Sequence, residues 1–188
     1  MNPLEWTAAA LGVVNVTLVV RRSVWNYPFG LAMVSLYFFV FFEARLYSDA
    51  LLQIFFFAVQ LYGWWNWLQA RAAAGEVTVT LLSPRARLAW LAGTAAAGLL
   101  WGLAMARYTD AAAPMTDAAI ASTSIAAQIL MAQRRIENWV LWILVDIVAV
   151  GLFASRGLYA TSALYGLFLM LSIAGLIGWR RALRPAAT

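Results

Sequence analysis

The stretch RRIENWVLWILVD, residues 134–146, opens with two arginines and a glutamate and continues as an apolar run that contains two tryptophans and an aspartate. The run continues to residue 155, which approaches the ~20 helical residues needed to cross a hydrocarbon core of ~30 Å. Trp139, Trp142 and Asp146 fall on one helical face because residues three, four and seven apart coincide there. The stretch therefore predicts a transmembrane helix over 138–155 whose inner face carries two indoles and an acid.

The whole chain repeats this apolar character. Its 188 residues are 64% hydrophobic and only 11% charged, whereas soluble domains are about 45–50% apolar and about 25% charged. We predict an all-α polytopic membrane protein with one polar loop at about 71–86, whose EVTVTLL segment is a short strand or an extended linker. The seven predicted spans are 4–20, 28–44, 49–69, 87–106, 116–133, 138–155 and 158–179.

The residue types that are missing exclude much chemistry. The chain has no Cys, no His and no Lys, so thiol nucleophiles, imidazole bases, Schiff bases and the usual zinc ligands are absent. No close pair of acids lies in mid-membrane, and we expect neither an enzyme, nor a cofactor, nor a metal site. The net charge of +5 fits basic cytoplasmic loops of a membrane protein better than a nucleic-acid partner.

The arginines orient the chain. With seven spans the loops alternate between two sides, and positive residues concentrate on the cytoplasmic side. The N-terminus is then predicted outside and the C-terminus in the cytoplasm. Ten arginines share one predicted side and three the other: Arg21, Arg22, Arg71, Arg85, Arg87, Arg134, Arg135, Arg180, Arg181 and Arg184 against Arg45, Arg107 and Arg156.

An internal repeat emerges when the chain is shifted over itself by 112 residues. Asn26 then aligns with Asn138, and Gly63 and Trp67 align with Gly175 and Trp179. The alternative is chance similarity between hydrophobic helices. A real repeat gives a 3+1+3 arrangement with parallel repeats, and a substrate site between the two units near the midplane. The predicted divisions are 1–70 for the first three-helix repeat, 71–112 for the polar loop and connector helix, and 113–188 for the second repeat and tail.

Polar side chains in the predicted spans are candidate binding groups. Each is costly in a bilayer and asks for a partner or a cavity. A single one is explained as well by a helix–helix hydrogen bond, worth about 0.6 kcal/mol on average in a membrane. Together they favour a polar, planar solute, because indoles stack on flat rings and attract cations while amides bind hydroxyls and carboxamides. Besides the face defined above, the candidates are Asn26, Tyr37, Gln53, Gln60, Trp64, Gln128 and Asn138.

Several motifs resemble the Pnu family of bacterial vitamin transporters. They are WNYPFG (25–30), EARLYSDALLQ (43–53), QLYGWWNW (60–67), AQILMAQRRIENWVLWILVD (127–146) and GLYATSALYGLF (157–168). The resemblance implies a SWEET-like 3+1+3 bundle and a homotrimer in the lipid of the bacterial inner membrane. It also implies facilitated diffusion of a dephosphorylated vitamin precursor, which a cytoplasmic kinase traps by phosphorylation.

The resemblance implies site residues as well. It places the aromatic clamp on the vitamin ring at Trp139 and Trp142, next to Asn138, and it extends to Gln60, Trp64 and Gln128 as lining residues. Nicotinamide riboside and thiamine are both flat cations that would suit indoles and Asp146, and the many amides together with the family motifs favour nicotinamide riboside. Thiamine, riboflavin and deoxynucleosides stay open, as do a proton-coupled symporter that uses Asp146 and a membrane sensor that binds without transport.

Overall fold

The fold is known from a computed structural model that describes residues 3–43, 47–109, 113–155 and 157–183. Within these residues the chain forms helices at all seven predicted spans, with ends that mostly differ by a few residues. Arg45, Arg156 and Arg184, which entered the count of charges above, lie outside the described residues. The helices are α1 (Pro3–Val20), α2 (Asn26–Glu43), α3 (Tyr47–Ala74), α4 (Pro84–Tyr108), α5 (Pro114–Ala132), α6 (Glu137–Ser155) and α7 (Tyr159–Arg181).

Five of these helices are long and apolar enough to cross a membrane, judged by length and composition: α1, α4, α5, α6 and α7. Helices α2 and α3 fall outside that group, in keeping with the polar residues that they carry. Asn26 and Glu43 bound α2, and Gln53 and Gln60 lie within α3. The protein is therefore an all-helical, multi-pass membrane protein over its described residues.

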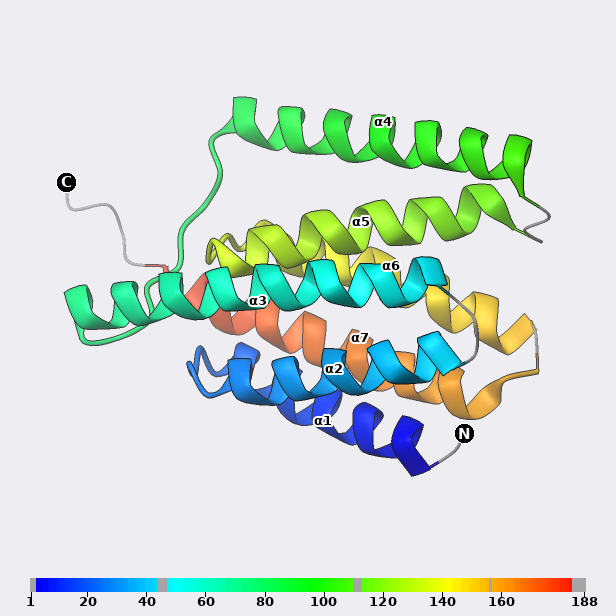
Figure 1. The fold of residues 1–188 in the computed structure, drawn as a ribbon. Helices are drawn as coiled ribbons and strands as arrows, with labels where there is room; N and C mark the ends of the chain where they lie inside the picture. Colours follow the sequence, from blue (N-terminus) through cyan, green and yellow to red (C-terminus); the bar gives the residue numbers. More distant parts are fainter. Residues whose placement is uncertain (1–2, 44–46, 110–112, 156, 184–188) are drawn as a thin grey trace.

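Six helices close a ring around the core. Contacts run from α1 to α2, α3, α5, α6, α7 and back to α1, so each of these helices touches two others in the ring. Helix α4 packs on α5 and lies outside the ring, as Figure 1 shows. The ring keeps α1, α2 and α3 together on one side and α5, α6 and α7 together on the other.

Small residues attach α4 to the ring. Gly98 and Gly102 are buried in α4, and a Cβ placed on Gly98 would lie 2.7 Å from Ser122 Oγ of α5. A Cβ on Gly102 would lie 2.6 Å from Met115 Sδ of the same helix. The Gly-x-x-x-Gly pattern thus serves close helix packing within the chain.

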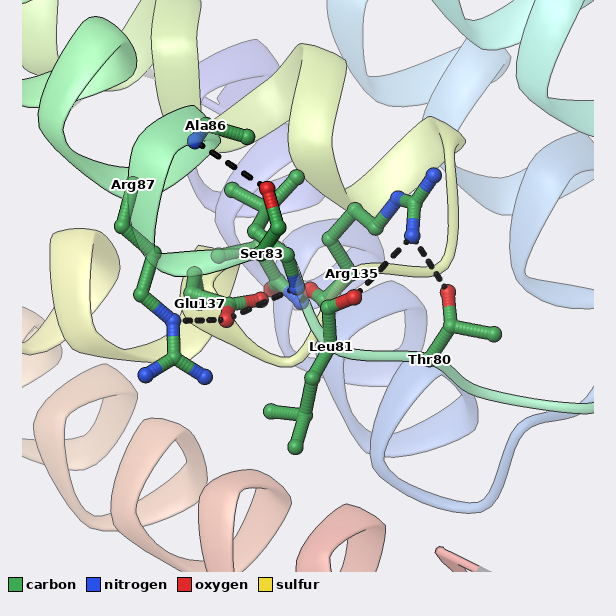
Figure 2. Close-up of polar contacts among 9 residues, drawn as sticks. Thr80, Leu81, Ser83, Ala86, Arg87, Arg135 and Glu137 are labelled. Atoms are coloured by element: carbon green, nitrogen blue, oxygen red, sulfur yellow. Dashed lines mark hydrogen bonds and ion pairs between the residues drawn. The ribbon is translucent and has the colours of Figure 1, made fainter. Parts of the chain in front are cut away.

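One end of the bundle gathers the arginine-bearing connections and is called the arginine-rich end below. It holds the α1–α2 turn (21–25), the α5–α6 turn (133–136), the linker segment (75–83) and the end of α7, on the left of Figure 1. The EVTVTLL stretch is extended rather than a strand, and it makes one isolated parallel bridge between Thr80 and Arg135. At the end of the linker segment Ser83 caps α4, its Oγ accepting from Ala86 N at 3.3 Å (Figure 2).

Candidate functional site

The α1–α2 and α5–α6 turns share one backbone geometry and lead into the candidate site. Arg22 and Arg134 are the non-glycine residues with positive φ in the described chain, at 56° and 62°. Arg22 N donates to Val19 O and Arg134 N to Met131 O, each at 2.9 Å. A non-glycine residue in the left-handed region is uncommon. Here it reverses the chain tightly, so that an asparagine in the first turn of α2 and another in the first turn of α6 are buried in the bundle.

Asn26 and Asn138 occupy equivalent places after these turns. Both are completely buried. Asn26 Nδ2 donates to Ser23 O at 2.7 Å and Asn138 Nδ2 donates to Arg135 O, which fixes each side chain against its own turn. The Oδ1 atom of each has no hydrogen-bond partner among the described residues. Two acceptors of predicted site residues therefore have unused hydrogen-bonding capacity.

An aromatic cluster lies next to these asparagines. Tyr27 and Trp67 meet edge to face at 5.4 Å, and Trp139 and Trp179 do the same at 5.4 Å. The indoles of Trp67 and Trp179 are 5.8 Å apart between their centroids. All four side chains are buried. Edge-to-face pairs of this kind add about 0.5–1.5 kcal/mol beyond the buried area, so these contacts stabilise the packing of the cluster.

Two indole hydrogen bonds tie the ring together across its closing contacts. Trp67 Nε1 of α3 donates to Met131 O of α5 at 3.2 Å. Trp179 Nε1 of α7 donates to Val19 O of α1 at 3.1 Å. Each carbonyl lies near the end of a helix and also accepts from the backbone of the turn that follows, so the indole adds a second hydrogen bond. These bonds hold α3 against α5 and α7 against α1.

Trp139 and Trp142 lie in different surroundings. A Cβ on Gly175 would be 2.5 Å from Cε2 and Cζ2 of Trp139, so this indole sits in the notch that the glycine leaves. Trp139 Nε1 is buried and has no partner among the described residues. Trp142 is half-buried and packs against a second cluster that includes Leu130 and Leu141. A clamp formed by these two indoles stays a prediction.

Gln60 is buried where α1, α2 and α3 approach each other. A Cβ on Gly30 would lie 2.0 Å from Gln60 Oε1 and 2.7 Å from Asn15 Nδ2, so both amides reach over that glycine. Asn15 Nδ2 donates to Asn26 O at 2.7 Å. Gln60 Oε1 is left without a partner among the described residues, as is Oδ1 of Asn26 in the nearby turn.

The remaining predicted amides are buried, and the remaining predicted aromatics stack on other rings. Gln128 is buried on α5, and its Nε2 has no partner among the described residues. Gln53 is buried on α3. Trp64 stacks on Tyr27 at 6.4 Å, whereas Tyr37 stacks on Phe41 of its own helix at 5.6 Å. The structure thus places Gln128 with the unpartnered groups and gives Tyr37 and Trp64 aromatic neighbours.

Asp146 is buried in the middle of α6 and has a partner on α7. Ser172 Oγ donates to Asp146 Oδ2 at 3.0 Å, and Ser172 is buried as well. This hydrogen bond explains how the carboxyl group is accommodated among apolar residues. The 112-residue shift aligns Ser172 with Gln60, and that alignment could have identified the serine from the sequence.

Six uncharged polar atoms are therefore buried in the ring helices without a hydrogen-bond partner among the described residues. A folded protein leaves few such groups, and each calls for a bound molecule or water. Oxygen acceptors, nitrogen donors and a phenol occur among them, which suits a solute with both hydroxyl and carboxamide groups. The atoms are Asn26 Oδ1, Tyr27 OH, Gln60 Oε1, Gln128 Nε2, Asn138 Oδ1 and Trp139 Nε1.

The predicted site residues leave out three buried aromatic members of this region, Tyr27, Trp67 and Trp179. Tyr27 stacks on Trp64 and Trp179 meets Trp139, while Trp67 contacts Tyr27 and Trp179. Trp67 and Trp179 were visible as a matched pair under the 112-residue shift, but the shift does not say that the two indoles meet across the ring. In the described residues no group of three or more His, Cys, Asp or Glu side chains could hold a metal ion.

Comparisons with known proteins point in one direction. Residues 2–181 match the family described as nicotinamide mononucleotide transporter. The nicotinamide riboside transporter PnuC of Escherichia coli (strain K12) is 31% identical, over 96% of this chain and 87% of that protein. The riboflavin/roseoflavin transporter RibM of Streptomyces davaonensis is 32% identical, over 93% and 85%. A crystal structure of the vitamin B3 transporter PnuC superposes with a TM-score of 0.79 at 29% identity, covering 96% of this chain and 81% of that one.

Proposed function

This chain belongs to the nicotinamide mononucleotide transporter family, and on that premise we propose that it carries nicotinamide riboside into the cell across the bacterial inner membrane. The observation that carries the proposal is the set of six unpartnered polar atoms buried in the ring helices. A purely structural interior would leave that hydrogen-bonding capacity unused at a cost of about 1–3 kcal/mol per group. A solute with a carboxamide and ribose hydroxyls would use it.

The proposed contacts follow from the chemistry of each group. Asn138, Gln60 and Gln128 would hydrogen-bond the carboxamide and the hydroxyls, and Trp139 and Trp142 would hold the ring between their indoles. The pyridinium of nicotinamide riboside is cationic, and indole faces attract cations. Asp146 would supply the matching negative group, and the hydrogen bond that it accepts from Ser172 does not remove that charge. The closed aromatic cluster would form the wall of the site toward the arginine-rich end.

Riboflavin is the second candidate, and the resemblance to RibM favours it. Riboflavin is neutral and larger than nicotinamide riboside, so it would use the amides and indoles without needing Asp146. Thiamine is a flat cation and would use all of these groups, while a deoxynucleoside would rely on the amides and hydroxyl contacts. The candidate substrates therefore fall into a cationic class and a neutral class, and Asp146 would distinguish the two.

The architecture proposed is a parallel repeat of α1–α3 and α5–α7 joined by α4. Two observations support it. The 112-residue shift matches α3 with α7 and α1 with α5, so it turns the contact of α3 with α5 into the contact of α7 with α1. The bonds Trp67 to Met131 O and Trp179 to Val19 O exchange under the same shift. All six ring helices, α2 and α3 included, would cross the membrane around the path of the solute.

The mode of transport proposed is facilitated diffusion, with a cytoplasmic kinase that traps the product by phosphorylation. The arginine-rich end would face the cytoplasm, because positive residues concentrate on that side, which leaves the N-terminus outside. The protein would work as a homotrimer in the membrane. A proton-coupled symporter differs by needing Asp146 to carry a proton, and a sensor differs by binding without uptake.

The test is a calorimetric panel on the purified protein. The panel holds nicotinamide riboside, nicotinamide mononucleotide, thiamine, riboflavin and one deoxynucleoside. We expect nicotinamide riboside to bind most tightly, and the phosphorylated mononucleotide to bind more weakly because no buried cation is assigned to its phosphate. Tight binding of riboflavin with none of nicotinamide riboside would overturn the assignment in favour of the second candidate.

A further inference from the structure

The linker segment between α3 and α4 is unusually well buried for a connection between two helices. Val77, Val79 and Leu82 expose 3%, 7% and 9% of their surfaces, whereas loops ordinarily run over the protein surface. The threonines between them alternate with the apolar residues in the sequence VTVTLL. The alternation gives the extended segment one face that is directed into the bundle.

That face rests on the centre of the ring. The hydrophobic cluster at the arginine-rich end contains at least one buried residue from each of the six ring helices, together with Val77 and Val79 of the linker segment. A cluster with a member from every helix of a ring spans its interior. The linker segment therefore lies over the place where the ring would open at this end. The six helix members are Val19, Tyr27, Trp67, Met131, Trp139 and Trp179.

Consecutive residues of the linker segment are bound to opposite turns. Arg22 Nη1, in the α1–α2 turn, donates to Val77 O at 3.2 Å. Arg134 Nη1, in the α5–α6 turn, donates to Thr78 Oγ1 at 3.0 Å and to Thr78 O at 3.1 Å. Burial, and then the neighbouring Arg135, lower the pKa of Arg134 from its ordinary value. The segment thus connects the two halves of the ring at their ends.

Backbone pairing continues along the α5–α6 turn. Thr80 N donates to Arg134 O, and Ile136 N donates to Thr80 O, both at 3.1 Å. Arg135 Nη1 adds bonds to Thr80 Oγ1 at 3.0 Å and to Leu81 O at 3.2 Å, which Figure 2 shows. This short pairing has the form of a strand bridge rather than of packed helices, so it can separate without disturbing the helices themselves.

Glu137 anchors the far end of the segment. Its Oε1 accepts from Leu82 N at 3.0 Å and from Arg87 Nε at 2.8 Å (Figure 2). Arg87 lies in the first turn of α4, which packs along α5 and reaches the start of α6 through this side-chain bond. The linker segment therefore has a fixed attachment at α4 and a detachable pairing over the ring.

We propose that residues 75–83 form the movable gate of the transport path at the arginine-rich end, closed in this structure by Val77 and Val79. The proposal rests on the proposed function, because a gate has meaning only if a solute passes through the ring. A solute leaving at this end must cross the hydrophobic cluster that the segment covers. Opening requires the segment to leave the α5–α6 turn while Glu137 and Arg87 hold its other end.

The absence of cysteine from the chain allows a direct test by disulfide formation. Thr80→Cys together with Arg135→Cys places two thiols at paired positions of the bridge, a geometry compatible with a disulfide. The control is Gly98→Cys with Ser122→Cys, because a Cβ on Gly98 lies 2.7 Å from Ser122 Oγ and that bond would join α4 to α5 outside the ring. Uptake of labelled nicotinamide riboside into liposomes is measured under oxidation and after reduction.

Oxidation is expected to lower uptake by the gate pair at least about tenfold, since gating motions limit such cycles, and reduction should restore it. The oxidised gate pair should still bind nicotinamide riboside in calorimetry, and the control pair should transport in both states. Full uptake by the oxidised and cross-linked gate pair would overturn the gate while leaving the transporter intact. A wild-type protein that neither binds nor transports the vitamin would overturn the proposed function, and the gate with it.

A second variant keeps the proposal testable if the disulfide forms poorly. Val77→Ala combined with Val79→Ala removes the apolar contacts that hold the segment on the cluster and leaves its backbone bonds. We expect this variant to exchange labelled nicotinamide riboside across the liposome membrane faster than the wild type. An unchanged or slower exchange rate in the folded variant would contradict a gate closed by these two residues.

Discussion

Gly175→Ala should disturb the proposed site through Trp139. A Cβ at this position would lie 2.5–2.6 Å from three atoms of the Trp139 indole, whereas carbon atoms in contact prefer about 3.5–4.0 Å. The indole must therefore retreat by about 1 Å, which its contact with Trp179 at 5.4 Å resists. Overpacking of this kind costs about 1–3 kcal/mol.

A matched control lies one turn further along α7. A Cβ on Gly178 would be 4.0 Å from Val20 O, an ordinary contact. Both substitutions gain the same helix propensity, about 1 kcal/mol for Gly to Ala, so their difference isolates the displacement of Trp139. Thermal unfolding should place the Tm of Gly175→Ala roughly 2–12 °C below that of Gly178→Ala, at about 2–4 °C per kcal/mol for a chain of this size.

The same displacement should weaken ligand binding. If Trp139 holds the vitamin ring, a loss of about 1.4 kcal/mol lowers the affinity tenfold, and calorimetry with nicotinamide riboside measures it. Adding Trp139→Phe to Gly175→Ala should recover the Tm without recovering the affinity, because the smaller ring relieves the overlap but grips less. Equal Tm and equal affinity in the two glycine variants would refute the packing and the clamp together.

Three further substitutions separate the remaining roles. Trp142→Ala should weaken nicotinamide riboside binding about tenfold, from a lost stacking pair of about 0.5–1.5 kcal/mol and lost contact area; an unchanged calorimetric affinity would argue against the clamp. Asp146→Asn keeps an acceptor for Ser172 and should weaken binding of nicotinamide riboside, a cation, but not of riboflavin. Equal effects on both ligands would show that the charge of Asp146 does not contribute to binding. Glu137→Gln keeps an oxygen for Leu82 N and should lower the Tm only slightly, since its ion-pair partner Arg87 is 46% exposed; a large loss would mean that the charge itself holds the linker segment.

The helices could be predicted because their apolar runs are long and their interruptions are sharp. Asn26 begins α2 just before Pro28, and Pro84 and Pro114 begin α4 and α5, where a missing N–H costs little. The predicted end of α3 at residue 69 fell short of Ala74. The sequence QARAAA after that point is less hydrophobic but consists of good helix formers, so propensity extends the helix past the apolar run.

The buried polar residues could be predicted one helix at a time, but their partners could not. Asp146 stood out as a carboxyl group in mid-span, yet its bond to Ser172 joins two helices whose relative rotation no periodicity gives. Trp67 and Trp179 aligned under the repeat, but their contact across the ring depends on how the two halves close. The sequence of the linker segment is compatible with a strand or an extended chain, because its burial comes from a cluster that only the assembled ring creates.

Uptake of labelled nicotinamide riboside into liposomes that hold only this protein, without any ion gradient, tests the central claim most directly. A facilitated-diffusion transporter should bring the vitamin inside to the outside concentration and no further, and Trp142→Ala should slow the approach. Uptake no greater than in protein-free liposomes would contradict the account. Accumulation above the outside concentration when a proton gradient is imposed would replace the uniporter with a symporter.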